Sequence, residues 1–106
     1  MEHLKWSQSE KRLSRSVFEH AVAAELAELI TEFKRRAADI RTPEEMWSLR
    51  EYLESAERDF ETKYDFRYSQ LLFVFGRLVR ERRITMEQLH GLSEDKLEYI
   101  RRIVSL

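Results

Sequence analysis

The chain has 106 residues, of which 37% are charged and 42% hydrophobic, with a formal net charge of −1 and no cysteine. This length suffices for one domain that folds without disulfide bonds, and the lack of cysteine excludes thiolate metal sites and cysteine nucleophiles. The near-zero net charge argues against a general polyanion binder, and no signal-peptide pattern or membrane-spanning apolar run is present. The protein is therefore expected to be soluble and cytoplasmic. Two glycines and one proline leave few helix breaks, which predicts an all-α fold.

The first predicted helix follows Ser7, because Ser7-Gln8-Ser9-Glu10 has the pattern of a capping box. No helix breaker follows until Thr42, so about thirty residues at 1.5 Å each form a rod of about 45 Å. Such a rod extends beyond a compact domain of this size, and its apolar residues favour a two-fold homodimer. The alternative is a monomeric bundle with a broken first helix. The interface residues expected on this helix are Leu26, Leu29 and Phe33.

The second predicted helix begins at Pro43, because Thr42-Pro43-Glu44-Glu45 is another capping box with proline at the first helical position. It runs to about Lys63 and is antiparallel to the first helix, since the link between them is short. Apolar residues recur along it at spacings of three and four, the period of a seam against another helix. The seam residues, which we assign to the dimer interface, are Met46, Leu49, Leu53, Ala56 and Phe60.

Trp47 lies about 100° round the second helix from the seam, on a charged face. Residues 42–65 carry eight acidic against three basic side chains. An aromatic side chain among paired charges has the composition of an interface hot spot. The alternative is that Trp47 packs within the dimer. The residues that we assign to partner binding on this face are Trp47, Arg50, Glu51, Glu54 and Arg58.

The remaining residues predict a small helical head. A third helix is expected from about Tyr64 with Asp65 as its cap, and Gly76 within it indicates close approach of a neighbouring element. Thr85 begins a short helix that closes at Gly91, and a last helix follows a cap at Ser93. We therefore expect one domain over residues 1–106, with a two-helix stalk and dimerisation region over 7–63 and a head over 64–106.

Residue types needed for catalysis or nucleic-acid binding do not cluster in this sequence. His3, His20 and His90 lack the spacing of a helical metal pair, and no glycine-rich loop or nucleophile elbow occurs. Residues 85–102 have some likeness to a helix-turn-helix, but three acidic residues on its second helix would repel phosphates. We expect no enzymatic activity, no cofactor, no metal and no nucleic-acid partner.

Motifs along nearly the whole chain resemble one known family. They are Trp6-Ser7-Gln8 with Glu10, Phe18, Glu25-Leu26, Trp47-x-Leu49, Leu53, Lys63-Tyr64-Asp65-x-Arg67, Phe73-Val74-Phe75, Leu89, Leu92 and Asp95-Lys96. In these residues the chain resembles the cyanobacterial fluorescence recovery protein family and its relatives in other bacteria.

The resemblance implies an all-helical homodimer with a long stalk and small heads, which performs no covalent chemistry. It implies binding of the photoactivated orange carotenoid protein, chiefly its carboxy-terminal domain, faster reversion of that protein to its orange form, and its release from the phycobilisome. The implied location is cytoplasmic, peripheral to the thylakoids through the phycobilisome. Carried over by position, the family's stalk tryptophan is Trp47, the residue that supports dimerisation is Met46, and a head residue in partner contact is Phe73.

Three positions depart from the cyanobacterial pattern. Arg50 and Glu51 stand where those members carry His and Asp, and Glu57 stands in place of an Arg. The change at Glu57 reverses a charge on the expected partner surface. A homologous dimeric adaptor with a different client, in signalling or transcription, is therefore the alternative function.

Overall fold

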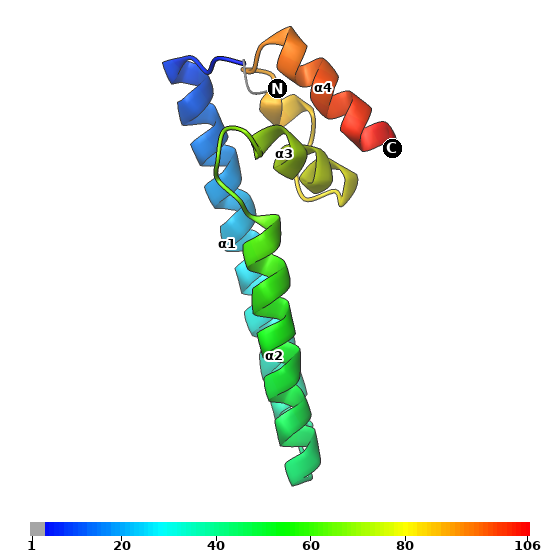
Figure 1. The fold of residues 1–106 in the computed structure, drawn as a ribbon. Coiled ribbons are helices and arrows are strands. Elements are labelled where there is room, and N and C mark those ends of the chain that lie inside the picture. The colour runs from blue at the N-terminus through cyan, green and yellow to red at the C-terminus, as the bar shows by residue number, and fades with distance from the viewer. Residues whose placement is uncertain (1–3) are drawn as a thin grey trace. The chain divides into compact units, whose positions relative to one another are not determined.

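The computed structural model describes residues 4–106. The elements are α1 (Gln8–Ala38), α2 (Pro43–Lys63), α3 (Leu71–Arg80), a short 3-10 helix η1 (Glu87–Leu89) and α4 (Glu94–Ser105), and residues 4–106 contain no strand (Figure 1). The prediction of an all-α chain is confirmed. The chain divides into two compact units, and α1 contributes to both. We call them the core unit, made of the N-terminal residues through Ala21 with Asp65–Leu106, and the hairpin unit, Val22–Tyr64.

Both predicted capping boxes are present at the starts of the long helices. At α1, the Glu10 backbone amide donates to Ser7 Oγ at 3.1 Å, and the Ser7 amide donates back to the Glu10 carboxylate at 2.9 Å. At α2, the Glu45 amide donates to Thr42 Oγ1 at 3.2 Å, and Pro43 occupies the first helical position. Because the capping box at its start is hydrogen-bonded and it contains no glycine or proline, α1 continues unbroken for 31 residues, as expected.

The core unit contains every buried apolar side chain of the described residues. Helices α3 and α4 pack together, and Leu71, Leu72, Phe75, Leu89 and Ile100 are fully buried. Gly76 on α3 is buried because Ile103 of α4 lies directly against it, and a Cβ atom there would overlap the Ile103 side chain. The further buried apolar residues are Val17, Phe18, Ala21, Val74, Leu78, Ile84, Leu92 and Leu97.

The expected start of the third helix near Tyr64 is wrong, because residues 64–70 form an irregular connection and α3 begins at Leu71. The aromatic rings in this connection pack on α1 instead. Phe66 makes an edge-to-face contact with Phe18 at 4.9 Å, and Tyr68 lies 5.3 Å from Trp6 between ring centroids. These contacts bury aromatic surface without requiring helical backbone, and they outweigh the local helix preference.

Of the two caps predicted after α3, the first forms capping hydrogen bonds and the second does not. Thr85 and Gln88 exchange capping-box bonds, but only the three residues of η1 follow. Ser93 occupies the N-cap of α4, yet its hydroxyl caps no backbone amide and lies 3.5 Å from Lys96 Nζ.

Just after α3, Arg82 has a φ of 63°, which is a left-handed conformation. The backbone amides of Arg82 and Arg83 donate there to carbonyl oxygens of α3, and these hydrogen bonds end the helix.

The hairpin unit consists of the second half of α1 and all of α2, which run in opposite directions after a short turn (Figure 1). At one end, Lys63 Nζ and the Tyr64 hydroxyl donate to the Glu25 carboxylate at 2.8 and 2.6 Å. Nearer the turn, the Arg36 guanidinium lies 3.8 Å from the centroid of the Tyr52 ring. Of residues 22–64, all of which are described, only Lys63 is buried. The hairpin is therefore held by polar and cation–π contacts, with no buried apolar core.

Candidate protein-binding surfaces

The hairpin unit exposes apolar side chains along both of its helices. Ile30 is 55% exposed and Met46 45% exposed, and Leu26 and Leu53 retain 38% and 39% exposure. The remaining residues assigned to the dimer interface, Leu29, Phe33, Leu49, Ala56 and Phe60, are half-buried. Contiguous apolar surface of this kind marks sites where another protein binds.

Four of the predicted interface residues line one groove of about 430 Å³ between α1 and α2. They are Leu26 and Leu29 from α1 with Leu53 and Phe60 from α2, and Glu54, Glu57 and Glu61 also line it. Leu49 lines a separate groove of about 510 Å³ together with Ile40, near the turn of the hairpin. A groove that combines apolar and charged side chains is typical of a site that binds another helix.

Trp47 is 52% exposed on α2, as expected from its position on a charged face. The Arg50 guanidinium lies 5.4 Å from the Trp47 ring centroid, and Arg50 Nε also lies 3.7 Å from a Glu54 carboxylate oxygen. Glu51 and Arg58 are exposed and share this face, since their helical rotation places all five residues within about 100°. The five predicted partner-binding residues of α2 therefore share one exposed face of the helix, and Arg50 lies beside the Trp47 ring.

Phe73 lies in the core unit, on α3. It is an exposed position on a helix that is otherwise largely buried. It is 45% exposed although its neighbours Leu72 and Val74 are buried. Its ring contacts that of Tyr99 on α4 edge to face, at 5.8 Å between centroids and an interplanar angle of 89°. Phe73 and Trp47 therefore belong to different units of the chain.

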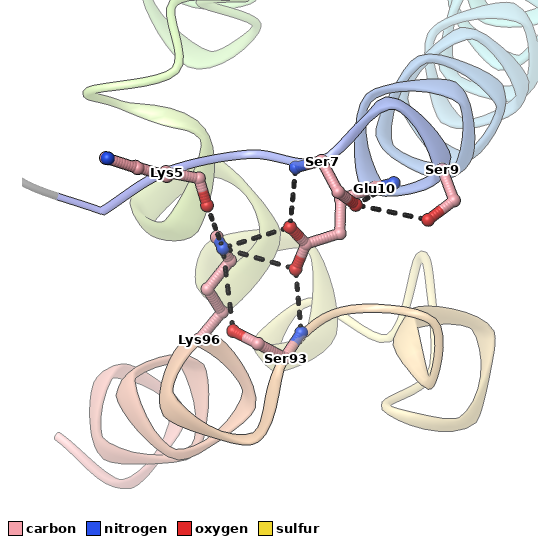
Figure 2. Close-up of polar contacts among 6 residues, drawn as sticks. All are labelled: Lys5, Ser7, Ser9, Glu10, Ser93 and Lys96. Carbon is pink, nitrogen blue, oxygen red and sulfur yellow. Dashed lines mark hydrogen bonds and ion pairs between the residues drawn. The ribbon is translucent and has the colours of Figure 1, made fainter.

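The most buried ionisable cluster was not apparent from the sequence (Figure 2). Glu10 accepts hydrogen bonds from the backbone amides of Ser7 and Ser93 at 2.9 and 2.8 Å, and Lys96 Nζ lies 3.2 Å from both of its carboxylate oxygens. Lys96 also donates to the Lys5 carbonyl at 2.6 Å. The sequence showed only the local Ser7–Glu10 box, since Lys96 is 86 residues from Glu10.

The environment of Glu10 determines its charge state. Burial by itself would raise the pKa of the carboxyl, but the Ser7 and Ser93 amides and the Lys96 ammonium together hold the pKa below its ordinary value. The carboxylate is therefore ionised and its hydrogen-bonding capacity is occupied. This cluster links α1 to α4 within the core unit, and the Glu10 carboxylate in it is not available as a base.

The described residues contain neither a group of three potential metal-ligating side chains nor a helix long and apolar enough to cross a membrane.

Comparisons with known proteins agree on one family. The family model of the photoprotection regulator fluorescence recovery protein matches residues 6–104. The fluorescence recovery protein of Synechocystis sp. strain PCC 6803 is 31% identical over 101 residues, which cover 95% of this chain and 93% of that protein. The structures of the fluorescence recovery proteins of Fremyella diplosiphon and Synechocystis each superpose with a TM-score of 0.90 at 30% identity, over 96% of this chain and 100% of theirs.

Proposed function

Because this chain belongs to the fluorescence recovery protein family, whose members regulate photoprotection, we propose that it binds the photoactivated orange carotenoid protein. In this proposal it holds the carboxy-terminal domain of that protein, accelerates the red-to-orange reversion and promotes release from the phycobilisome. It does so without covalent chemistry, in the cytoplasm and peripheral to the thylakoids.

The observation that carries the proposal is the exposed Trp47 with its charged neighbours Arg50 and Glu54. A half-exposed tryptophan flanked by charges offers a large contact area with polar groups that fix orientation. A partner that contacts both separated domains of the carotenoid protein raises their effective concentration and lowers the free-energy cost of re-docking them. Phe73 supplies a second exposed ring for the same client.

The active form in this proposal is a homodimer. Support comes from the hairpin unit, which buries no apolar side chain and leaves an apolar groove at Leu26, Leu29, Leu53 and Phe60. A second copy of the hairpin offers the same apolar surface in self-complementary form, as a two-fold interface requires. We accordingly propose residues 7–63 as the stalk and dimerisation region and 64–106 as the head of a single domain.

The test is the dark red-to-orange relaxation of photoconverted orange carotenoid protein with a substoichiometric amount of this chain. We expect acceleration by the unmodified chain and, for Trp47→Ala, roughly thirtyfold weaker binding of the client, since truncating a hot-spot aromatic costs about 2 kcal/mol. Leu106→Ala, which truncates an apolar side chain that is 85% exposed, is the matched control and should leave the binding unchanged. Equal binding by Trp47→Ala and unmodified chain would remove Trp47 from the client surface.

The second candidate function is that of a dimeric adaptor for a different client. Glu57 favours it, because an acidic side chain stands where the family resemblance implies an arginine, which reverses a charge on α2. A folded, dimeric chain that leaves the relaxation rate unchanged would favour this second function.

A further inference from the structure

A third groove, distinct from the two grooves of the hairpin unit, lies in the core unit along the N-terminal half of α1. It has a volume of about 490 Å³ and shares no residue with the surface proposed above for the carotenoid protein. Its lining residues are Gln8, Lys11, Arg12, Arg15, Ser16, Glu19, His20 and Tyr68. Those on α1 recur at spacings of three and four, so they form one continuous helical face.

This groove is basic although the chain as a whole has a net charge of −1. Lys11, Arg12 and Arg15 face a single carboxylate, that of Glu19, which lies 3.9 Å from Arg15 Nε. Among residues 4–106, no carboxylate lies within ion-pairing distance of Lys11 or Arg12. Two of the cations are therefore available to an external anionic group.

Aromatic rings hold two of the cations in place. Lys11 Nζ lies 5.4 Å from the centroid of the Tyr68 ring, and the Arg15 guanidinium lies 3.7 Å from that of Phe66. The rings themselves are fixed by mutual contact, with Tyr68 packed between Trp6 and Phe66. Cation–π contacts restrict the rotamers of long side chains before any partner binds, which lowers the entropy lost on binding.

We propose that this groove, which we call the basic groove, binds an extended acidic peptide segment of a protein partner. From Gln8 to Glu19 the helical face is about 17 Å long, which matches roughly five residues of extended chain. Tyr68, which is 37% exposed, offers contact to an apolar or aromatic side chain of the same segment. Glu19 within the groove disfavours a continuous polyphosphate backbone, so a peptide with separated carboxylates fits this surface better than nucleic acid.

The experiment measures fluorescence anisotropy of a short fluorescein-labelled peptide, with alternating Glu and Asp around one Tyr, titrated with the full chain. We expect saturable binding that weakens as salt shortens the Debye length from about 10 Å at 0.1 M to about 3 Å at 1 M. The double variant Lys11→Glu/Arg12→Glu should bind roughly tenfold more weakly or worse, because two attractions become repulsions. Arg12→Gln, which changes one exposed side chain, should give a smaller loss.

The matched control is Arg101→Glu/Arg102→Glu on α4, which changes the net charge by the same amount at exposed positions. It should bind the peptide as the unmodified chain does, with all variants showing the same helical circular dichroism. Equal losses in both double variants, or no loss in either, would overturn the proposal.

Three further outcomes would assign the basic groove to another occupant and also overturn the peptide proposal. They are tighter binding of a DNA duplex than of the peptide, tighter binding of phosphatidylserine vesicles, and a change in sedimentation of Lys11→Glu/Arg12→Glu that points to a second copy of the chain. Because the peptide assay contains no carotenoid protein, its result is independent of the relaxation assay.

Discussion

At the scale of single residues, Glu10 has two structural roles. Its carboxylate completes the capping box of α1 through the Ser7 amide, and it pairs with Lys96 at the start of α4. Lys96 is 3% exposed and also lies 4.9 Å from the centroid of the Trp6 ring.

Three of the ion pairs in the structure join residues that carry the family resemblance. They are Glu10 with Lys96, Glu25 with Lys63 and Asp65 with Arg67. Part of the family resemblance therefore lies in residues that pair with one another within the chain.

Lys96→Met is expected to lower the free energy of unfolding by about 3 kcal/mol, because removing one partner of a buried ion pair leaves the other charge unpaired. Glu10 keeps its two backbone amide donors, which places the loss at the low end of the usual range. Urea unfolding followed by circular dichroism measures it. Arg102→Met is the control, since its pair with Glu98 is exposed and should contribute under about 1 kcal/mol. Equal effects of the two substitutions would show that burial of the Lys96 pair is energetically irrelevant.

The lowered pKa of Glu10 predicts a dependence of stability on pH. In the unfolded chain the Glu10 carboxylate binds its proton at the ordinary pKa of 4.5, whereas in the folded chain it does so only at lower pH. The stabilisation that the ionised carboxylate provides is therefore fully present above pH 4.5 and is lost as the pH falls through the lowered pKa of the folded chain. We therefore expect the unmodified chain and Glu10→Gln to differ most in unfolding free energy at neutral pH. Urea titrations at successive steps below pH 4.5 should show this difference shrinking. A difference that stays constant would contradict the ion-pair account.

At the scale of elements, the contact between α3 and α4 explains why a helix contains glycine. Gly76 costs about 1 kcal/mol of helix propensity relative to alanine, but it allows Ile103 to lie against the α3 backbone. The overlap that a Cβ atom would make involves Ile103 Cγ2 and Cβ, and the Cβ atom cannot move without shifting the backbone of α4. The close approach that the sequence indicated at this glycine is confirmed.

Gly76→Ala is expected to destabilise the chain by about 1 kcal/mol net, because an overpacking cost of about 1–3 kcal/mol exceeds the gain in helix propensity. In an Ile103→Ala background the overlapped Cγ2 is absent, so the same substitution should cost less. Thermal unfolding of the four proteins of this double-mutant cycle measures the coupling. Additive effects would mean that Ile103 is not what excludes a side chain at Gly76.

At the scale of the whole molecule, the buried apolar residues are confined to the core unit, and the hairpin unit exposes its own. Two helices that share only polar and cation–π contacts and a few half-buried side chains gain little from burial, so their apolar seam favours an external partner. This distribution is the physical basis for proposing a homodimer. The charged face of α2 carries the exposed Trp47.

Met46→Glu is expected to convert the proposed dimer to monomer, since each copy would place a charge in an apolar interface. A cost of about 1.4 kcal/mol in each of two copies raises the dissociation constant roughly a hundredfold. Sedimentation velocity distinguishes the two states. Ser55→Glu is the control, because it adds the same charge at an exposed position of α2 on the side away from the seam, about 80° round from Trp47. Identical sedimentation of the two variants would refute the seam assignment.

Helices whose ends have local causes could be predicted from the sequence. Thr42 and Pro43 start α2, and Ser7 with Glu10 starts α1, because a capping box uses only residues three positions apart. The helical period likewise separated Trp47 from the seam at Met46 and Leu53. Family membership followed from motifs spread along the whole chain and was confirmed by the comparisons.

Features that depend on residues far apart in the sequence could not be predicted and arise only in the folded chain. The start of α3 shifted to Leu71 because Phe66 and Tyr68 pack on α1, and the pairing of Lys96 with Glu10 joins opposite ends of the chain. The basic groove likewise combines one face of α1 with Tyr68 from the segment before α3. Local periodicity cannot encode such contacts, because their stability comes from burial and charge pairing between segments that meet only in the folded chain.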